Sequence, residues 1–356
     1  MLGIFAGSWA VAAFVDFFSD TKTRPSAAMR AVMAAAEVGD ERAGEDPSVN
    51  RLVERCAALL GKPAALYLPS GTMCNEIALA VHCRPGDEVI CDATSHLIGF
   101  EGGGPAALAG VMLNAIAGDR GRFDAAQLQS VLRPDRLYAP RQRLLEVEQT
   151  ANLGGGTIWP LAQLDEVAAA AKAHGLATHM DGARLFNAAV ASGVSVARYA
   201  EYYDSVWIDF SKGLGAPGGA VLAGSADFIH EATRLKLRWG GAMRQSGIIA
   251  AACDYALDHH VERLAEDHAN AQALAHGIAA IDGLGIDLAA VQTNLVYFDV
   301  QRPDLDAPRL SAALLHRGVR VSEMGPRTLR AVTHLDVDAA AVELALKALR
   351  EALAEH

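Results

Sequence analysis

Short apolar runs alternate with helical periodicity through the first 250 residues of this chain. Runs bounded by turn-forming residues are typical of buried strands, and they occur at 65–68, 88–91, 144–147, 176–180, 205–210 and 220–223. Between them, apolar residues recur at helical spacing over 72–82, 161–174 and 184–191. Because strands that alternate with helices form a mostly parallel sheet covered on both faces, the pattern predicts an α/β fold.

The pattern changes after about residue 251. There the sequence predicts a long helix, a strand and a closing helix, at 253–280, 294–300 and 339–355. We therefore predict three parts: an N-terminal arm at 1–25, a large domain at 26–251 and a smaller C-terminal α+β domain at 252–356. The apolar start of the arm lacks the basic residues of a signal peptide and the length of a membrane span.

The composition narrows the class of partner. A formal net charge of −11 without a cluster of Lys and Arg argues against nucleic acid and anionic membranes, and favours small molecules and other copies of the chain. Five cysteines at irregular spacing without a C-x-x-C pair predict buried, reduced thiols and a cytoplasmic protein. His259, His260 and His268 lack the spacing of metal ligands, so we expect no metal site and place them on a solvated helix face.

Lys212 follows the predicted strand 205–210 and lies between small residues, in Ser211-Lys212-Gly213. A lysine at a strand end beside small side chains can be desolvated and approached by a planar ligand. Desolvation lowers the pKa of a lysine and makes it a nucleophile toward an aldehyde. The alternative is a solvated loop lysine.

Two further features precede this lysine. Asp181 closes a strand and lies where ligands of open α/β sheets bind, although it could also cap the following helix. Gly71 and Thr72 follow a strand and open a helix whose first N–H groups could bind a phosphate, although ordinary capping also explains them. The order of phosphate cradle, Asp and Lys is that of aspartate-aminotransferase-like (fold type I) enzymes, which use pyridoxal phosphate (PLP). There an Asp keeps the pyridine nitrogen protonated.

The segment Ser19-Asp20-Thr21-Lys22-Thr23-Arg24-Pro25 resembles the opening motif of the L-threonine aldolases of low specificity, in the β-eliminating lyase family. Further segments resemble the same family, at 38–40, 45–50, 179–184, 211–217, 240–247 and 332–337. The resemblance extends from about Asp16 to the C-terminus. It implies a lyase that cleaves L-threonine, L-allo-threonine or related β-hydroxy-α-amino acids to glycine and an aldehyde.

The resemblance also implies a role for each matching residue. Lys212 would carry PLP as a Schiff base, Asp181 would hold the pyridine nitrogen, and His96 would stack on the ring and serve as an acid or base. Arg184 would lie near the ring oxygen or the substrate carboxylate, which Ser19 and Arg330 would also bind. The phosphate ligands would be Gly71, Thr72, Ser211 and, from a neighbouring subunit, Arg244. The protein would then be a homodimer or homotetramer with its active site at a subunit interface.

Two positions depart from the family pattern. Ala151 stands where many members have a His beside the hydroxyl of the substrate, and Ala43 stands where a Tyr is frequent. We therefore expect His96, directly or through a water, to be the base for the hydroxyl group, and a wider pocket to accept aryl substituents. Transamination or β-elimination would use the same Lys212 and Asp181, and a non-catalytic binding protein is a third possibility.

Overall fold

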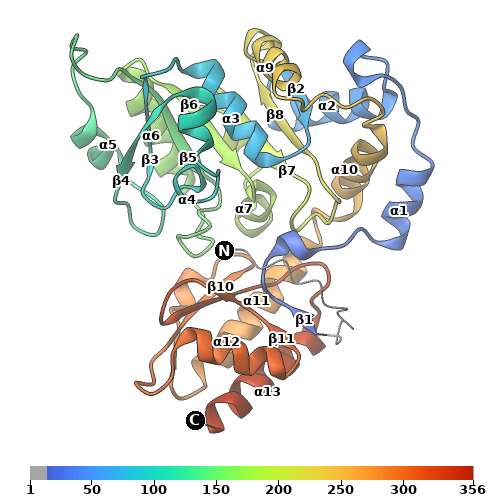
Figure 1. The fold of residues 1–356 in the computed structure, drawn as a ribbon, viewed down its shortest axis with the longest axis vertical. Helices are drawn as coiled ribbons and strands as arrows, with labels where there is room; N and C mark the ends of the chain where they lie inside the picture. The colour runs from blue at the N-terminus through green and yellow to red at the C-terminus, as the bar shows by residue number, and fades with distance from the viewer. Residues whose placement is uncertain (1–13, 356) are drawn as a thin grey trace.

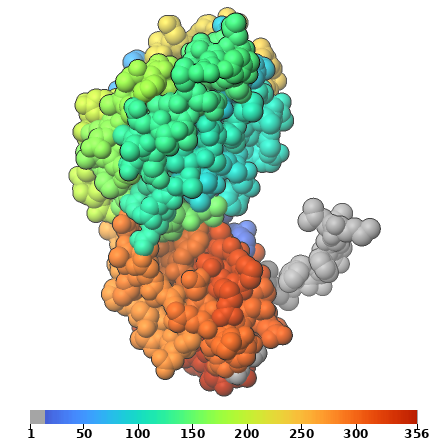
Figure 2. Space-filling model, turned by 90° about the vertical axis from the view of Figure 1, so that its left-hand side faces the viewer, coloured from blue at the N-terminus to red at the C-terminus, as the bar shows by residue number. Residues whose placement is uncertain are grey.

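The computed structural model of the protein describes residues 14–355, which form two lobes stacked along the long axis (Figure 1). The larger lobe contains most of the chain up to α10, and the smaller contains the C-terminal part together with β1. The space-filling view shows the two lobes as separate masses that meet across a waist (Figure 2). Among residues 14–355, no helix combines the length and the apolar character that crossing a bilayer requires.

A seven-stranded sheet forms the centre of the larger lobe. Its strand order is β2 (Ala64–Leu68), β8 (Ala220–Gly224), β7 (Ser205–Asp209), β6 (Ala177–Gly182), β5 (Gln142–Glu148), β3 (Glu88–Asp92) and β4 (Met112–Ile116). Strands β7, β6, β5, β3 and β4 run parallel, and β8 runs antiparallel to both of its neighbours. The mostly parallel sheet predicted from the sequence is therefore confirmed. The edge strand β4 was not predicted, because much of it is exposed and its apolar residues form no continuous run.

Helices cover both faces of this sheet, because successive side chains of a strand point to opposite faces. Ile208 packs into the core on one face, whereas its neighbour Trp207 packs on the other. The Ile208 face is covered by α2 (Pro47–Leu60), α5 (Ala125–Val131), α6 (Leu161–Ala173), α7 (Leu185–Ser192), α8 (Val196–Ala200) and α10 (Gly247–His259). The other face is covered by α3 (Gly71–His82), α9 (Ala226–Arg238) and the π-helical turn Pro105–Ala109. The short helices α1 (Ala27–Ala34) and α4 (His96–Gly99) complete the lobe.

The smaller lobe has its own hydrophobic core. An antiparallel sheet in the order β12 (Ser322–Glu323), β13 (Thr328–Val332), β10 (Leu295–Val300), β9 (Leu284–Gly285) packs with α11 (Leu264–Ala279), α12 (Ala307–His316) and α13 (Ala339–Ala354). The N-terminal strand β1 (Val15–Asp16) pairs in parallel with β11 (Val319–Arg320). Single turns of 3₁₀ helix occur at Asp20–Lys22, Glu41–Ala43 and Leu288–Ala290.

The predicted helix over 253–280 was wrong in one respect, because α10 ends at His259 and α11 begins at Leu264. Cys253 and Ala256 pack into the core of the larger lobe, whereas Leu274 packs into the core of the smaller. The chain bends between α10 and α11 because residues of the two helices pack into different hydrophobic cores. The domain boundary near residue 251 stays a prediction, and the predicted N-terminal arm lies largely outside the described residues.

Candidate active site

Three parallel strands bring the predicted residues to one edge of the large sheet. Glu148 at the end of β5 is in register with Asp181 on β6, and Asp181 is in register with Trp207 on β7. Lys212 follows three residues after the end of β7. Since parallel strands end at the same edge, two carboxylates and the lysine converge at the kind of position where α/β sheets bind ligands.

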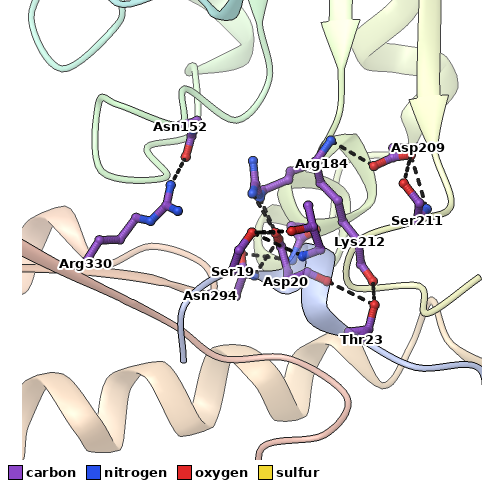
Figure 3. A network of polar contacts seen from close by, with 12 residues as sticks. Ser19, Asp20, Thr23, Asn152, Arg184, Asp209, Ser211, Lys212, Asn294 and Arg330 are labelled. Carbon is purple, nitrogen blue, oxygen red and sulfur yellow. Dashed lines mark hydrogen bonds and ion pairs between the residues drawn. The ribbon is translucent and has the colours of Figure 1, made fainter. Parts of the chain in front are cut away.

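Lys212 lies at the centre of this edge (Figure 3). Its Nζ is 2.8 Å from Asp209 Oδ2, and its side chain is 19% exposed. The Thr23 hydroxyl donates to the backbone carbonyl of Lys212 at 2.8 Å, and His260 Nδ1 donates to the carbonyl of Leu214 at 2.6 Å. The loop that carries the lysine is therefore held by the N-terminal segment on one side and by the end of α10 on the other.

Asp181 is fully buried beside it. Its two oxygens accept hydrogen bonds from Asn75 Nδ2 at 2.9 Å and from the Ala183 N–H at 2.9 Å. Burial raises the pKa of Asp181, although nearby His96, Asn75 and Lys212 oppose that shift. The alternative capping role is not seen, because the N-cap of α7 is Arg184 and it makes no side-chain capping bond. A cationic ring nitrogen would be a suitable partner for this carboxylate.

The helix α3 begins next to the same strand ends. Ser70 caps it by accepting the Met73 N–H at 3.3 Å, and a Cβ at Gly71 would collide with the ring of Trp207. Trp207 also lies under Lys212, whose Nζ is 5.5 Å from the ring centroid. The start of α3 and the lysine therefore flank one indole ring. Thr72 is exposed at the first turn, where free N–H groups and the helix dipole favour a phosphate. Ser211, the other predicted phosphate ligand in this chain, donates its hydroxyl to Asp209 at 2.9 Å.

His96 is paired with a carboxylate that the sequence did not single out. Its Nδ1 lies 2.6 Å from Glu101 Oε1, and its ring stacks on Phe100. Burial opposes the charged form, but the hydrogen bond to Glu101 and the negative charges of Asp181, Glu101 and Glu148 together outweigh it and raise the pKa of His96. The backbone N–H of His96 donates to Glu148 at 3.3 Å. Burial and the neighbouring Asp181 raise the pKa of Glu148 to about 7.

Arg184 contacts a second residue that the sequence did not single out. Its guanidinium makes two hydrogen bonds to Asp20, at 2.8 and 2.7 Å, and both side chains are buried. Asn294 Nδ2 adds a third contact to this carboxylate at 3.1 Å. Burial would raise the pKa of Asp20, but Arg184, with smaller contributions from Lys212 and Asn294, outweighs it and holds that pKa well below its usual range. This pair joins the N-terminal segment to the sheet edge (Figure 3).

Arg330 reaches the site from β13 of the smaller lobe, on the other side of Figure 3. It donates to Asn152 Oδ1 at 3.0 Å and to the Phe18 carbonyl at 3.3 Å. Its Nε is buried and has no hydrogen-bond partner among residues 14–355. Ser19, next to Phe18, is buried and caps the 3₁₀ turn by accepting the Thr21 N–H at 3.2 Å. An unpaired buried guanidinium N–H is a donor suited to a substrate carboxylate.

Arg244 lies on the surface, where its NH1 is 2.7 Å from Asp40 Oδ2 and its side chain is 58% exposed. No contact joins it to the other site residues within residues 14–355.

Ala151 is 2% exposed, and the backbones of Gly121 and Gly154 approach it so closely that a Cβ on either would crowd its methyl group. Backbone therefore fills part of the space that a longer side chain would need. Ala43 lies exposed in the turn Glu41–Ala43. The wider pocket stays a prediction.

The solvated helix face predicted for three histidines was wrong for two of them, since only His259 is exposed. His260 is 6% exposed and supports the lysine loop, and His268 Nε2 lies 3.2 Å from Asn187 Nδ2. These rings pack inward because the chain bends between α10 and α11. Residues 14–355 contain no cluster of ligating side chains suited to a metal ion.

The residues at the sheet edge fit PLP. Lys212, the buried carboxylate of Asp181, His96 and the start of α3 lie together at this edge. A side chain at Gly71 would collide with Trp207 and obstruct the start of the helix. Arg330 supplies a buried donor without a partner among residues 14–355. This donor set matches an anionic, planar cofactor and an amino-acid substrate.

Comparisons with known proteins agree with this geometry. A profile of the β-eliminating lyase family matches residues 16–301. The chain is 40% identical to the low specificity L-threonine aldolase of Escherichia coli strain K12, over 91% of this chain and 94% of that protein. It is 37% identical to low-specificity L-threonine aldolase 1 of Arabidopsis thaliana, over 95% and 96%.

Among solved structures, the threonine aldolase of Leishmania major is similar in fold, with a TM-score of 0.81 and 20% identity over 94% of this chain and 98% of that one. A serine palmitoyltransferase structure with PLP shares the fold at a TM-score of 0.73 and 18% identity, over 96% and 88%. The family match covers most of the chain, and the similarity in fold extends over both lobes. The chain therefore belongs to the β-eliminating lyase family and, within it, to the L-threonine aldolases, which are PLP-dependent lyases with the aspartate-aminotransferase-like fold.

Proposed function

We propose that this protein cleaves L-threonine, L-allo-threonine or related β-hydroxy-α-amino acids to glycine and an aldehyde. The observation that carries the proposal is the convergence of Lys212, Asp181 and His96 at one sheet edge, in a chain 40% identical to a named threonine aldolase. When bound, PLP supplies an electron sink for the pair released as the Cα–Cβ bond breaks.

Each residue has a distinct task in this proposal. Lys212 binds the cofactor through Nζ and releases it to the amino group of the substrate. Asp181 holds a proton on the ring nitrogen of the cofactor, a task suited to a buried carboxylate. His96 takes the proton of the substrate hydroxyl at Nε2, because Glu101 holds the proton on Nδ1.

Substrate orientation falls to the arginines. The free Nε of Arg330, with Ser19 nearby, binds the substrate carboxylate and holds the Cα–Cβ bond in the orientation for cleavage. Arg184, which Asp20 keeps in place, would contact the ring oxygen of the cofactor. We favour Arg330 over Arg184 as the ligand of the substrate carboxylate, because Arg184 already makes two hydrogen bonds to the oxygens of Asp20.

Gly71, Thr72 and Ser211 bind the phosphate, and Arg244 completes the phosphate site of a neighbouring subunit. This assignment is supported by the surface position of Arg244, whose side chain is 58% exposed within one chain. The protein is then a homodimer or homotetramer with shared active sites.

The five buried, unpaired cysteines favour a reducing compartment and hence a cytoplasmic location.

A product assay tests the proposed reaction. The purified protein is saturated with PLP and incubated with L-threonine, L-allo-threonine and L-phenylserine, and glycine and aldehyde are measured. We expect equimolar glycine and aldehyde. A keto acid together with ammonia in their place would indicate β-elimination, a keto acid without ammonia would indicate transamination, and absence of all four products would contradict the proposal. A higher kcat/KM for phenylserine than for threonine would support the wider pocket at Ala151 and Ala43.

A further inference from the structure

The side-chain amide of Asn75, on α3, contacts two carboxylates of the site, those of Asp181 and Glu101. Its Nδ2 donates to Asp181 Oδ2 at 2.9 Å and to Glu101 Oε1 at 3.0 Å. Its Oδ1 accepts from Trp207 Nε1 at 2.6 Å and lies 3.1 Å from His179 Nε2. Asn75 is fully buried. An amide has two N–H donors and two lone pairs, so all four of its hydrogen-bonding positions are used.

The orientation of this amide is determined by its neighbours. Indole nitrogen can only donate, so the atom facing Trp207 is the amide oxygen. The two N–H groups then face Asp181 and Glu101, which accept hydrogen bonds as carboxylates. Turning the amide over would place N–H against N–H at Trp207 and oxygen against oxygen at both carboxylates.

The network behind Asn75 is fixed as well. His179 Nε2 donates to Asn75 Oδ1, so its Nδ1 accepts from the Ser205 hydroxyl at 2.8 Å. Ser205 Oγ lies 2.8 Å from His82 Nε2. Burial lowers the pKa of His179 to about 3 and that of His82 to about 4, so both rings are neutral at pH 7. The oxygen of the amide is therefore bound by His179 and Trp207, which stay neutral near pH 7.

The two carboxylates in front of Asn75 have different tasks in the proposed function. Asp181 is the partner for the ring nitrogen of the cofactor, and Glu101 holds the Nδ1 proton of His96. We propose that Asn75 is a positioning residue that holds both carboxylates in place and favours the charged form of Asp181, and thereby joins cofactor binding to the proton-accepting state of His96. This inference rests on the proposed function.

The titratable groups that surround this network come from five parts of the fold. They are His96 and Glu101 after β3, Glu76 on α3, Glu148 on β5, Asp181 on β6, and Lys212 after β7. Four of the six are acids. Each Asn75 N–H therefore offsets repulsion in a crowded acidic site, and replacing the donor by an acceptor would disturb both ends of the network at once.

The test replaces Asn75 by Asp, which keeps the oxygen that faces Trp207 but turns the donor into an acceptor. A third carboxylate favours protonation of Asp181, so we expect PLP affinity, measured by equilibrium dialysis at pH 7, to fall by about 10-fold or more. The added negative charge also favours protonated His96, so the acid limb of the kcat/KM profile should move to higher pH. A role in packing alone would not move that limb.

Asn114→Asp is the matched control. Asn114 Nδ2 also donates to a buried carboxylate, Glu88, at 2.8 Å, but on the edge strand β4. We expect this variant to keep the cofactor affinity and pH profile of the parent protein. Equal cofactor affinities and pH profiles for Asn75→Asp and Asn114→Asp would overturn the inference.

A second variant covers the case in which Asn75→Asp does not fold. Trp207→Phe removes the donor that orients the amide and keeps an aromatic ring in its place. We expect it to weaken PLP binding and move the acid limb in the same direction, and an unchanged affinity and profile would overturn the inference. If the parent protein binds PLP but forms no glycine, the proposed function fails, and the dialysis results alone then decide the role of Asn75.

Discussion

Asp20→Asn tests whether the N-terminal segment holds the site together through a buried ion pair. Asp20 makes two hydrogen bonds to Arg184 at 2.8 and 2.7 Å, and the two side chains are 0% and 5% exposed. The substitution leaves a buried guanidinium without its counter-ion. Breaking one partner of a buried pair costs about 3–5 kcal/mol, so we expect the free energy of unfolding to fall by that amount at pH 7.

Urea unfolding of the cofactor-free protein, followed by circular dichroism, measures this change. Asp16→Asn is the matched control, because Asp16 pairs with Arg320 at 3.3 Å near the surface, with 22% and 36% of the side chains exposed. Such a pair contributes about 1 kcal/mol or less. Equal losses for the two variants would refute the reasoning.

The pH dependence of Asp20→Asn gives a second check. Because Arg184 depresses the pKa of Asp20 in the folded state, the stabilisation is present above the unfolded pKa and is lost as the pH falls through the folded value. The difference between the parent protein and Asp20→Asn should therefore be full at pH 7 and should shrink in acid, below about pH 4.

Two further predictions concern Glu76 and His96. Burial and Glu101 raise the pKa of Glu76 in the folded protein from 4.5 to about 8. Between these two pH values the unfolded chain loses this proton and the folded protein keeps it, so the free energy of unfolding falls as the pH rises. Glu76→Gln should remove that slope and gain roughly 3 kcal/mol at pH 7 in urea titrations, and parallel pH curves for both proteins would contradict this. His96→Asn should slow glycine release by at least about 100-fold while PLP stays bound, whereas near full turnover would exclude His96 as the base.

Much of the fold followed from local patterns. Runs such as 205–210 could be recognised as strands because buried parallel strands are continuously apolar, and the structure has β7 at Ser205–Asp209. The bend between α10 and α11 could not be predicted, because the sequence continues as one helical pattern. Only packing against two different cores separates Cys253 from Leu274.

The site was predictable where a residue type and a strand end coincide, as at Lys212 and Asp181. The residues that hold these groups were not found, because their contacts join distant parts of the chain. Asp20 meets Arg184 across 164 positions, and Asn75 meets Asp181 across 106. The segment Ser19–Pro25 was recognised and contains Asp20, but nothing local to it indicates a role for Asp20 or a buried arginine as its partner.

The measurement that tests the central claim most directly identifies the lysine that carries the cofactor. The protein is saturated with PLP, reduced with borohydride to fix the cofactor on the lysine nitrogen, digested and analysed by mass spectrometry. We predict a phosphopyridoxyl group on Lys212 and loss of the visible absorbance band in Lys212→Ala. Modification of Lys236, a buried lysine on α9 whose pKa burial lowers to about 7, or no modified lysine at all would contradict the claim.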